Sequence, residues 1–503
     1  MISALFGAIA VVIIFLATSK YGIGISPDSA CYISIAENLN HGNGYAIYDL
    51  EPAVAWPPLY PTILAAGDFF GLELSVWGRL LNIFLFGLLV FLAVNWIFKN
   101  IIWTPLKWIG AFGILFSPAL IYISKYAWSE LLFSVLVILT LFQLQRLQKS
   151  TNWPNILILT IICALACLAR YIGVTLVIFS AFCILLRADT KFVKRVTYAA
   201  TFSLVSFLPL FFWLLRNFSV SNTLTGPRTE SSYSILENVL FSIDSLSSWI
   251  LPQSLLGYIR GPIAVLVVLA LIIYFWITRL NSSRDRKFNC HLPTMFSYSI
   301  FYIFCLIFIA TAAALGRIDW RFMSPIYIPL LFSIVIMTDF VMANRGLKNK
   351  ILRKVIFCFS LIWAIYLTAN GLSEIRNDIN SGAGGYATDQ WQNSELADYL
   401  SSNPLNGKVY SNFPDAIYAL TGQRASIAPR KTYFASNSAP PNDMKEFADE
   451  IKKNSSISLV WFKNSVREIV YKPEDLQQSF ELSKAKEFSD GVIYELTLKP
   501  TGV

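Results

Sequence analysis

Charged residues are scarce in this chain. Of its 503 residues only 14% are charged, whereas 55% are hydrophobic. Soluble globular domains carry about 25% charged residues, so this composition excludes an ordinary water-soluble protein. Apolar runs of roughly the 17–25 residues that cross a bilayer recur along most of the chain. The sequence therefore predicts a polytopic α-helical membrane protein.

Cysteine is also too sparsely placed to stabilise a fold or to bind a metal. Five of the seven cysteines lie inside apolar runs, one lies in a basic loop and one is alone near the N-terminus. In chain order they are Cys31, Cys163, Cys167, Cys183, Cys290, Cys305 and Cys358. No pairing among them resembles a disulfide framework or a zinc site, so we interpret them as packing residues.

The N-terminal apolar run, residues 2–19, lacks the features of a cleaved signal peptide. It has no basic segment before it and no small-residue cleavage pattern after it. We therefore interpret it as a retained first span. The chain also lacks an internal repeat and any low-complexity tract.

Eleven apolar runs predict eleven membrane-spanning helices. They cover residues 2–21, 75–98, 105–123, 129–146, 152–169, 171–187, 196–216, 261–280, 294–315, 325–343 and 352–372.

Basic residues are confined to alternate loops between these runs. One set of loops contains Lys99, Lys107, Arg146, Lys149, Arg187, Lys191, Lys194, Arg195, Arg284, Arg286, Lys287, Arg345, Lys348, Lys350, Arg353 and Lys354. In the other set, the long segment 22–74 has no Lys or Arg, and only Lys20 and Lys125 weakly oppose the pattern. Cytoplasmic loops carry the basic excess, so we expect the N-terminus in the cytoplasm of a multi-pass protein of the inner (cytoplasmic) membrane. Residues 22–74, 217–260, 316–324 and 373–503 then lie outside, and the net charge of +9 needs no nucleic-acid partner.

The composition divides the chain into two parts. Residues 1–375 form the membrane part, with 22–74 as its first outer loop, and the Gly/Asn-rich segment 376–390 is typical of a linker. Residues 391–503 are predicted to form a soluble extracytoplasmic α/β domain, because helical and strand patterns alternate there. The predicted helices are Glu395–Ser402, Pro414–Leu420 and Asp443–Lys453, and the predicted strands are Lys408–Tyr410, Ile457–Phe462 and Val492–Leu498.

Charged residues near membrane depth are costly and usually functional. At the predicted outer ends of the spans they are Asp28, Glu37, Glu130, Arg170, Arg216, Arg228, Arg260, Arg317 and Arg321. The arginines run against the positive-inside bias, and a lipid phosphate at the outer leaflet would explain them because a guanidinium matches phosphate oxygens. The alternative for each arginine is snorkelling toward headgroups or pairing with an acid.

The first outer segment places an acidic residue at the membrane surface. Ser26 is a good helix N-cap and Pro27 a good first residue, so Asp28 lies in the first turn with Tyr32 on the same face. Glu37, nine positions later, lies about 180° around the helix, so these two carboxylates do not form a pair. The alternative for Asp28 is a helix-dipole contact worth about 0.3–1 kcal/mol.

The motifs around Asp28 resemble those of a known superfamily. Asp28–Tyr45 has the pattern D-x-x-x-Y-x-x-I-A-x-x-L-x-x-G-x-G-Y, and Trp56–Pro61 reads W-P-P-L-Y-P. Together they resemble the GT-C glycosyltransferases, in particular the branch with protein O-mannosyltransferases and the aminoarabinose transferases that modify lipid A. Four later segments are similar to further landmarks of that branch, so the resemblance covers residues 1–345. They are Ser129–Phe133, Leu168–Tyr171, Trp213–Asn217 and Arg321–Pro325.

The resemblance implies an inverting membrane glycosyltransferase with a GT-C-like catalytic domain over residues 1–375. It would move a sugar from a polyprenyl-phosphate donor to a lipid, glycan or protein acceptor outside the cytoplasm, with Asp28 as general base. The donor phosphate would lie on Arg170, Arg216, Arg317 and Arg321. Substrate would contact Tyr32, Glu130, Tyr45, Trp56 and Tyr60, for whose aromatic members interfacial anchoring is the alternative.

Some members of the superfamily use an acidic pair or a divalent cation beside the first-loop aspartate. Here Pro27 precedes Asp28 and Ser29 follows it, so no adjacent acid is present and no cofactor is assigned. A divalent cation stays open, with Glu37 and His41 as its ligands if the loop folds back.

Two other functions fit the outline. A transporter or flippase of a lipid-linked or anionic solute is one, although transporters usually carry internal repeats and polar residues at the midplane. A ligase or polymerase of lipid-linked glycans is the other.

Overall fold

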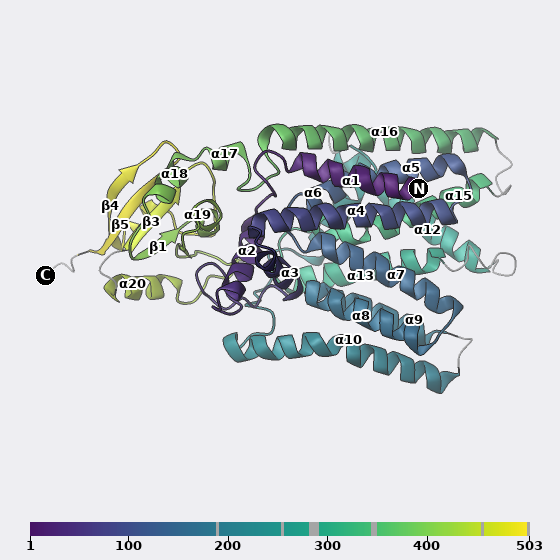
Figure 1. Ribbon diagram of the computed structural model, residues 1–503, viewed down its shortest axis with the longest axis horizontal. Coiled ribbons are helices and arrows are strands. Elements are labelled where there is room, and N and C mark those ends of the chain that lie inside the picture. Colours follow the sequence, from purple (N-terminus) through teal and green to yellow (C-terminus); the bar gives the residue numbers. More distant parts are fainter. Residues whose placement is uncertain (188–190, 253–255, 281–290, 344–349, 454–456, 500–503) are drawn as a thin grey trace.

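The computed structural model describes all residues except 188–190, 253–255, 281–290, 344–349, 454–456 and 500–503. It has two parts, a bundle of long helices that run along the long axis and a smaller domain with a sheet at one end (Figure 1). The basic positions Arg284, Arg286, Lys287, Arg345 and Lys348 fall outside the described residues, as does Cys290.

Each predicted span corresponds to a helix or to a pair of consecutive helices. They are α1 (Ile2–Ala17), α4 (Leu74–Asn100), α5 (Thr104–Leu115) with α6 (Pro118–Ser124), α7 (Glu130–Lys149), α8 (Trp153–Ala169), η1 (Tyr171–Gly173) with α9 (Val174–Leu185), α10 (Phe192–Ser221), α12 (Gly257–Leu280), α13 (His291–Ala312), α14 (Trp320–Met323) and η2 (Ser324–Ile326) with α15 (Tyr327–Ala343), and α16 (Lys350–Ser381). Within the described ranges, seven of these segments are long and apolar enough to cross a membrane, and four more are shorter apolar helices. The prediction of a polytopic helical fold with about eleven spans is confirmed.

The third predicted span is broken rather than continuous. Helix α5 ends at Leu115, and Ser117 caps α6, because its hydroxyl accepts a hydrogen bond from the backbone N–H of Leu120 at 3.3 Å. Pro118 follows at the first helical position, where its missing N–H costs nothing.

Helices differ greatly in how much of their surface the protein covers. The most apolar 18-residue stretch of α7 is 83% buried, whereas the corresponding stretches of α10 and α16 are 22% and 17% buried. The uncovered faces carry large apolar side chains such as Phe211, Phe212 and Ile362, which lipid would cover. Thus α7 lies at the centre of the bundle, while α10 and α16 lie on its outside (Figure 1).

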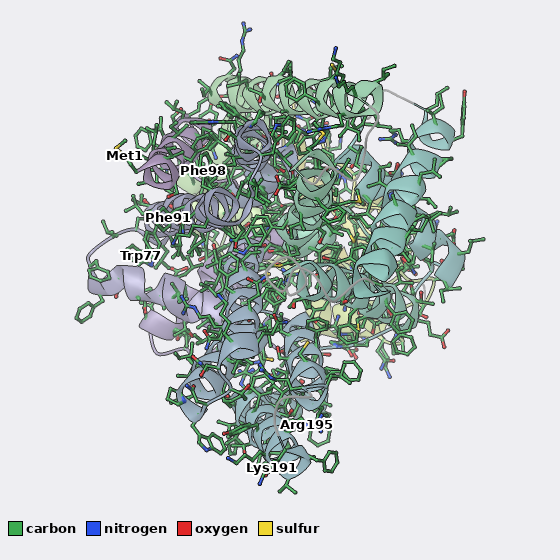
Figure 2. The ribbon with its side chains drawn as sticks, turned by 90° about the vertical axis from the view of Figure 1, so that its right-hand side faces the viewer. Met1, Trp77, Phe91, Phe98, Lys191 and Arg195 are labelled. Atoms are coloured by element: carbon green, nitrogen blue, oxygen red, sulfur yellow. The ribbon has the colours of Figure 1, made fainter. Side chains whose placement is uncertain are left out.

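The two ends of the bundle differ in charge and in loop length. At the end nearer the small domain, residues 22–74 form α2 (Pro27–Asn40) and α3 (Leu59–Phe69), and α11 (Ile235–Ser248) follows α10. The opposite end carries the N-terminus and the start of α10 (Figure 1), to which the basic residues Lys191 and Arg195 belong, and Figure 2 views the molecule from that end. This placement agrees with the assignment made from loop charge, in which the N-terminus and the loop with Lys191 and Arg195 lie on the same side of the membrane.

The C-terminal domain has a mixed five-stranded sheet in the order β2-β1-β3-β5-β4. Its strands are β1 (Lys408–Ser411), β2 (Ser426–Ile427), β3 (Ile457–Phe462), β4 (Phe480–Glu487) and β5 (Gly491–Leu498), and its helices are α17 (Asp389–Gln392), α18 (Glu395–Ser402), α19 (Pro414–Thr421), α20 (Asp443–Lys453) and α21 (Pro473–Leu476). Strand β1 pairs in parallel with β2 and β3, while β5 is antiparallel to β3 and β4. The predicted soluble α/β domain is therefore confirmed as a fold.

The segment predicted as a linker begins as helix. Helix α16 continues through Ser381, because nothing before Gly382 interrupts it, and Gly382 has a φ of 95° that other residues rarely adopt. The next residues are tied to the first outer loop, since the backbone N–H of Tyr386 donates to the carbonyl of Ile25 at 2.7 Å. A Cβ at Gly385 would lie 2.0 Å from that same carbonyl, so the contact requires glycine.

Lys125, one of the two exceptions to the charge pattern, is buried and paired. Its ammonium lies 2.7 Å from Asp378 and 3.1 Å from Glu374, both on α16. A lysine held in this way joins α6 to α16, and it does not report loop orientation.

Candidate active site

Asp28 lies in the first turn of α2, at the end of the bundle nearer the small domain. The Ser26 hydroxyl caps the helix by accepting from the backbone N–H of Ser29 at 3.2 Å, and Pro27 occupies the first position. The same hydroxyl accepts from the indole N–H of Trp128 at 2.6 Å, which fixes the cap against the start of α7. The local prediction for this turn is confirmed.

The Asp28 carboxylate has one partner on each oxygen. Arg321 lies 2.6 Å from Oδ2, and the indole N–H of Trp56 donates to Oδ1 at 3.2 Å. The side chain remains 35% exposed, so an incoming group can still reach it. Burial raises the pKa of Asp28, but the positive charge of Arg321, its hydrogen bond and that of Trp56 outweigh burial and lower the pKa below its usual 3.8.

Next to Asp28 lies a cluster of one buried acid and two partly buried arginines. Glu130, at the first position of α7, is fully buried and pairs with Arg170 at 2.5 Å and with the Nε of Arg321. Arg321 therefore bridges Glu130 and Asp28. The second oxygen of Glu130, Oε2, is buried without a hydrogen-bond partner in the part of the chain that the structure describes. A buried acceptor left unpaired costs about 1–3 kcal/mol, so it is a candidate contact for a bound group.

Arg321 is placed by the short helix α14. Asp319 caps this helix by accepting from the backbone N–H groups of Arg321 at 2.9 Å and Phe322 at 3.2 Å. The guanidinium carbon of Arg321 lies 4.2 Å from the centroid of the Trp128 ring, a cation–π contact. The sequence analysis missed Asp319, although an aspartate just before a helical start is a usual N-cap signal.

Two tyrosines of the motif, Tyr32 and Tyr60, pack next to this cluster. The Tyr32 hydroxyl is 3.0 Å from the hydroxyl of Ser129, which also accepts from Arg170 at 3.2 Å. Tyr60 is fully buried and meets Tyr32 edge to face, with ring centroids 5.0 Å apart. Tyr60 therefore supports the site through packing in this structure, and its contact with substrate stays a prediction.

Arg216 is engaged with the first outer loop. Its two terminal nitrogens donate to the carbonyls of Ala53 at 2.9 Å and Tyr45 at 3.0 Å. Tyr45 is itself buried, packs edge to face on Trp213, and donates from its hydroxyl to the carbonyls of residues 56 and 57. Arg216 and Tyr45 therefore hold the loop that presents Trp56.

Arg317 pairs with a residue that does not belong to the Asp28 cluster. It pairs with Asp244 of α11 at 2.9 Å, and Arg260 pairs with the other oxygen of the same aspartate at 2.8 Å. The side chain of Arg317 is 56% exposed. The structure thus joins Arg170 and Arg321 with Asp28, and it gives Arg216 and Arg317 other partners.

Glu37 and His41 lie on the side of α2 that meets the C-terminal domain. Glu37 accepts a hydrogen bond from the hydroxyl of Tyr418 in α19. Both residues line a cavity of about 590 Å³ between α2, the start of α4 and the C-terminal domain. No group of three His, Cys, Asp or Glu side chains that could hold a metal ion occurs among the described residues.

The arrangement is chemically asymmetric. It provides one reachable carboxylate, a pair of partly buried arginines beside it and a buried carboxylate oxygen that has no partner among the described residues. Such a site can accept a proton from a hydroxyl and stabilise negative charge on a neighbouring group.

Comparisons with solved structures show which proteins share this fold. Comparison with protein-family profiles and with curated protein sequences returns no match. ArnT from Cupriavidus metallidurans, a lipid A aminoarabinose transferase, superposes in its apo state with a TM-score of 0.61 at 12% identity, covering 98% of this chain and 97% of that one. The same protein bound to undecaprenyl phosphate gives a TM-score of 0.62 at 12% identity over the same shares. Arabinofuranosyltransferase AftD from Mycobacteria gives 0.52 at 10% identity, covering 99% of this chain and 42% of that one. This chain has the GT-C fold that the motifs predicted.

Proposed function

We propose that this chain, with the fold of ArnT and AftD, is a membrane glycosyltransferase that transfers a sugar from a polyprenyl phosphate. The observation that carries the proposal is Asp28, a partly exposed carboxylate paired with an arginine that is anchored on buried Glu130. A site that couples a base to fixed positive charge suits a reaction in which a hydroxyl loses a proton while a phosphate departs. The undecaprenyl phosphate bound to ArnT supports the same class of lipid.

In the proposed reaction Asp28 is the general base. The acceptor hydroxyl oxygen forms a bond to the anomeric carbon, its proton moves to Asp28, and the bond from that carbon to the phosphate oxygen breaks with its electron pair on phosphate. One displacement inverts the configuration of the anomeric carbon. Phosphate is already a competent leaving group, so a second carboxylic acid is not needed, in contrast to glycoside hydrolases.

The proposed phosphate-binding groups are Arg321 and Arg170. Arg321 shares its guanidinium between two carboxylates, so an arriving phosphate competes with Asp28 for it. That competition would release Asp28 from its strongest partner and raise its basicity when the donor is bound. Arg216 acts in this proposal by positioning the first loop, and Arg317 by holding Asp244.

Glu130 is proposed to act through its unpaired oxygen. Its Oε1 is occupied by the two arginines, while Oε2 is buried without a partner among the described residues. A sugar hydroxyl that donates to Oε2 would satisfy it and orient the ring before transfer. Trp56 would contribute both its hydrogen bond to Asp28 and an aromatic face.

The experiment that tests the function measures transfer and transport side by side. Labelled polyprenyl-phosphate monosaccharide is supplied to the detergent-purified protein with a membrane extract as acceptor, and to sealed vesicles that contain the protein. We expect label in the acceptor and no time-dependent movement across the vesicle membrane. Transport without transfer would favour the flippase. A parallel reaction receives a labelled polyprenyl-linked oligosaccharide, and transfer from that donor alone would favour the ligase. Repeating the assay with EDTA tests the divalent cation.

The proposed orientation places the site and the C-terminal domain outside the cytoplasm. It rests on the basic loops at the end opposite that domain. A membrane-impermeant thiol reagent applied to intact cells should modify Ser231→Cys and spare Lys350→Cys. The reverse labelling would overturn the orientation.

A further inference from the structure

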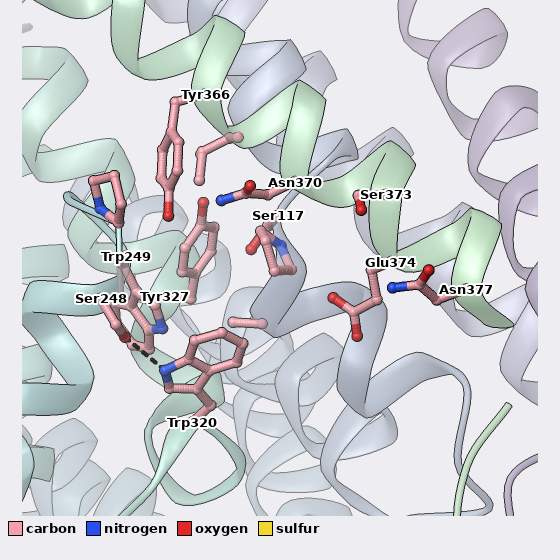
Figure 3. Close-up of a pocket in the computed structure, with 14 residues that line it drawn as sticks. Ser117, Ser248, Trp249, Trp320, Tyr327, Tyr366, Asn370, Ser373, Glu374 and Asn377 are labelled. Carbon is pink, nitrogen blue, oxygen red and sulfur yellow. Dashed lines mark hydrogen bonds between the residues drawn. The ribbon is translucent and has the colours of Figure 1, made fainter. Parts of the chain in front are cut away.

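A second cavity lies under α16, outside the ion cluster described above. Its volume is about 610 Å³, within the ~300–1,000 Å³ usual for small-ligand sites. It is enclosed by α16, the start of α6, the end of α11, and α14 with α15 (Figure 3). Its lining is aromatic and polar, and the side chains labelled in Figure 3 come from four separate parts of the chain.

Helix α16 presents a polar stripe to this cavity. Tyr366, Asn370, Glu374 and Asn377 line it at spacings of four, four and three residues, which place them on one helix face. The opposite face of α16 is apolar and exposed, as at Ile365 and Leu372. Polar side chains at membrane depth are costly unless they face water or a ligand, so Tyr366 and Asn370 are better placed against a polar cavity than against lipid.

One buried donor in the lining has no partner. The indole N–H of Trp249, a residue 8% exposed, makes no hydrogen bond within the described ranges. The neighbouring indole of Trp320, by contrast, donates to the hydroxyl of Ser248 at 2.6 Å. The ring of Tyr327 meets Trp249 edge to face with centroids 5.1 Å apart, which fixes its orientation. An orphaned donor beside aromatic faces is a site for an acceptor oxygen on a molecule with apolar C–H faces.

The charges of the lining do not fit a phosphate. No arginine or lysine is among the described residues that line the cavity, and its acidic member is Glu374. Lys125 lies 3.1 Å from Glu374 but is shared with Asp378 on the same helix. Two carboxylates against one ammonium leave no excess of positive charge for an anion. This cavity therefore differs from the arginine cluster beside Asp28.

We propose that the cavity binds an uncharged, hydroxyl-rich glycan, the sugar portion of one of the two substrates. Aromatic rings would stack on the C–H faces of the sugar, while Asn370 and the Trp249 indole would bind its hydroxyl oxygens. Helix α14 connects the cavity with the candidate active site, because Trp320 lines the cavity and the next residue, Arg321, pairs with Asp28. This inference rests on the proposed function for the origin of the glycan.

Photocrosslinking in native membranes tests the proposal without knowledge of the sugar. We would replace Tyr366 with p-benzoylphenylalanine, and separately Ser373, an exposed member of the lining that tolerates a bulky group. Matched controls carry the same probe at Ile365 and Leu372, adjacent exposed positions outside the lining. The full-length protein is irradiated, purified and digested, and the labelled peptides are weighed by mass spectrometry.

We expect hexose or pentose mass increments at positions 366 and 373 and acyl-chain adducts at 365 and 372. Asn370→Leu should lower the glycan adduct roughly two- to tenfold, the effect of one hydrogen bond, while Thr368→Val, whose hydroxyl bonds within α16, should not. An adduct that contains polyprenyl phosphate identifies the donor as the source, and a glycan without it identifies the acceptor.

Acyl-chain adducts alone in the cavity, or equal glycan yields at lining and control positions, would overturn the proposal. Such a result in a protein that still transfers sugar would leave the proposed function standing. Glycan adducts in a protein without transfer activity would support glycan binding in the cavity and contradict the proposed function.

Discussion

Helix α2 carries two carboxylates whose surroundings differ at its two ends. Near the N-terminal end, Asp28 pairs with Arg321 of the bundle. About two and a half turns later, Glu37 accepts a hydrogen bond from Tyr418 of the C-terminal domain. The two acids have the same chemistry, but only Asp28 lies next to fixed positive charge. Under the proposed function, the part of α2 around Asp28 is its reactive end and the part around Glu37 is its docking end. Each prediction below tests that division.

The largest expected effect is on Asp28. Asp28→Asn should lower turnover at least about a hundredfold, because an amide does not accept the acceptor's proton. The fold should persist, since asparagine loses at most the ~0.3–1 kcal/mol helix-dipole contribution in the first turn. Turnover with the labelled donor and thermal unfolding of the same preparation check both parts. Near-normal turnover of Asp28→Asn together with an inactive Glu37→Gln would reverse the assignment of the two ends.

Arg321 should have the second largest effect. Arg321→Lys keeps the charge but loses the fork that reaches Asp28 and Glu130 at once, so we expect a roughly 10–100-fold fall in kcat/KM for the donor. The matched control is Arg317→Lys, because Arg317 is 56% exposed and its ion pair with Asp244 belongs to the weak surface class. Equal losses in the two variants would argue against a special role for Arg321.

The pH profile separates the electrostatic role of Arg321 from a packing role. In the wild type the lowered pKa keeps Asp28 deprotonated. The acid limb of kcat/KM should therefore lie below pH 3.8, the usual pKa of an aspartate. Burial, which raises the pKa, is the largest influence on Asp28, and Arg321 is its strongest opponent. Arg321→Gln should therefore move the acid limb to higher pH, as residual activity across the acidic range would reveal. An acid limb that stays in place would contradict the coupling between the two residues.

Local features of the site were predictable, whereas its long-range contacts were not. The Ser26-Pro27-Asp28 turn depends on neighbouring residues alone, so the N-cap and the place of Asp28 in the first turn could be predicted from the sequence. The meeting of Glu130, Arg170 and Arg321 depends on how three distant helices pack, and spacing along the chain carries no such information. For the same reason the sequence grouped Arg216 with the phosphate ligands, although its donors reach the carbonyls of Ala53 and Tyr45.

The fold shows the same limit in the C-terminal domain. Helices α18 and α20 and strand β3 were predicted at their observed bounds, because the two helices have a strong apolar period and the strand is an unbroken apolar run. Strand β4 (FELSKAKE) was missed, since it lies at the edge of the sheet and most of its side chains are exposed. The helical start of the segment 376–390 was missed because its Asn and Gly content is typical of loops, while α16 continues until Gly382.

The smallest effect on turnover is expected at the other end of α2. Glu37→Gln keeps a hydrogen-bond acceptor for Tyr418 and lies on the helix face away from Asp28, so turnover should change by no more than about threefold. Glu37→Gln should instead loosen the docking of the C-terminal domain, because the hydrogen bond from Tyr418 then ends on a neutral amide oxygen and no longer on a charged carboxylate. Limited proteolysis between residues 382 and 388 measures this opening, and Tyr418→Phe, which removes the donor, should accelerate cleavage at least as much. If Glu37→Gln left proteolysis unchanged but stopped transfer, the docking end of α2 would belong to the reaction after all, and the division between its two carboxylates would fail.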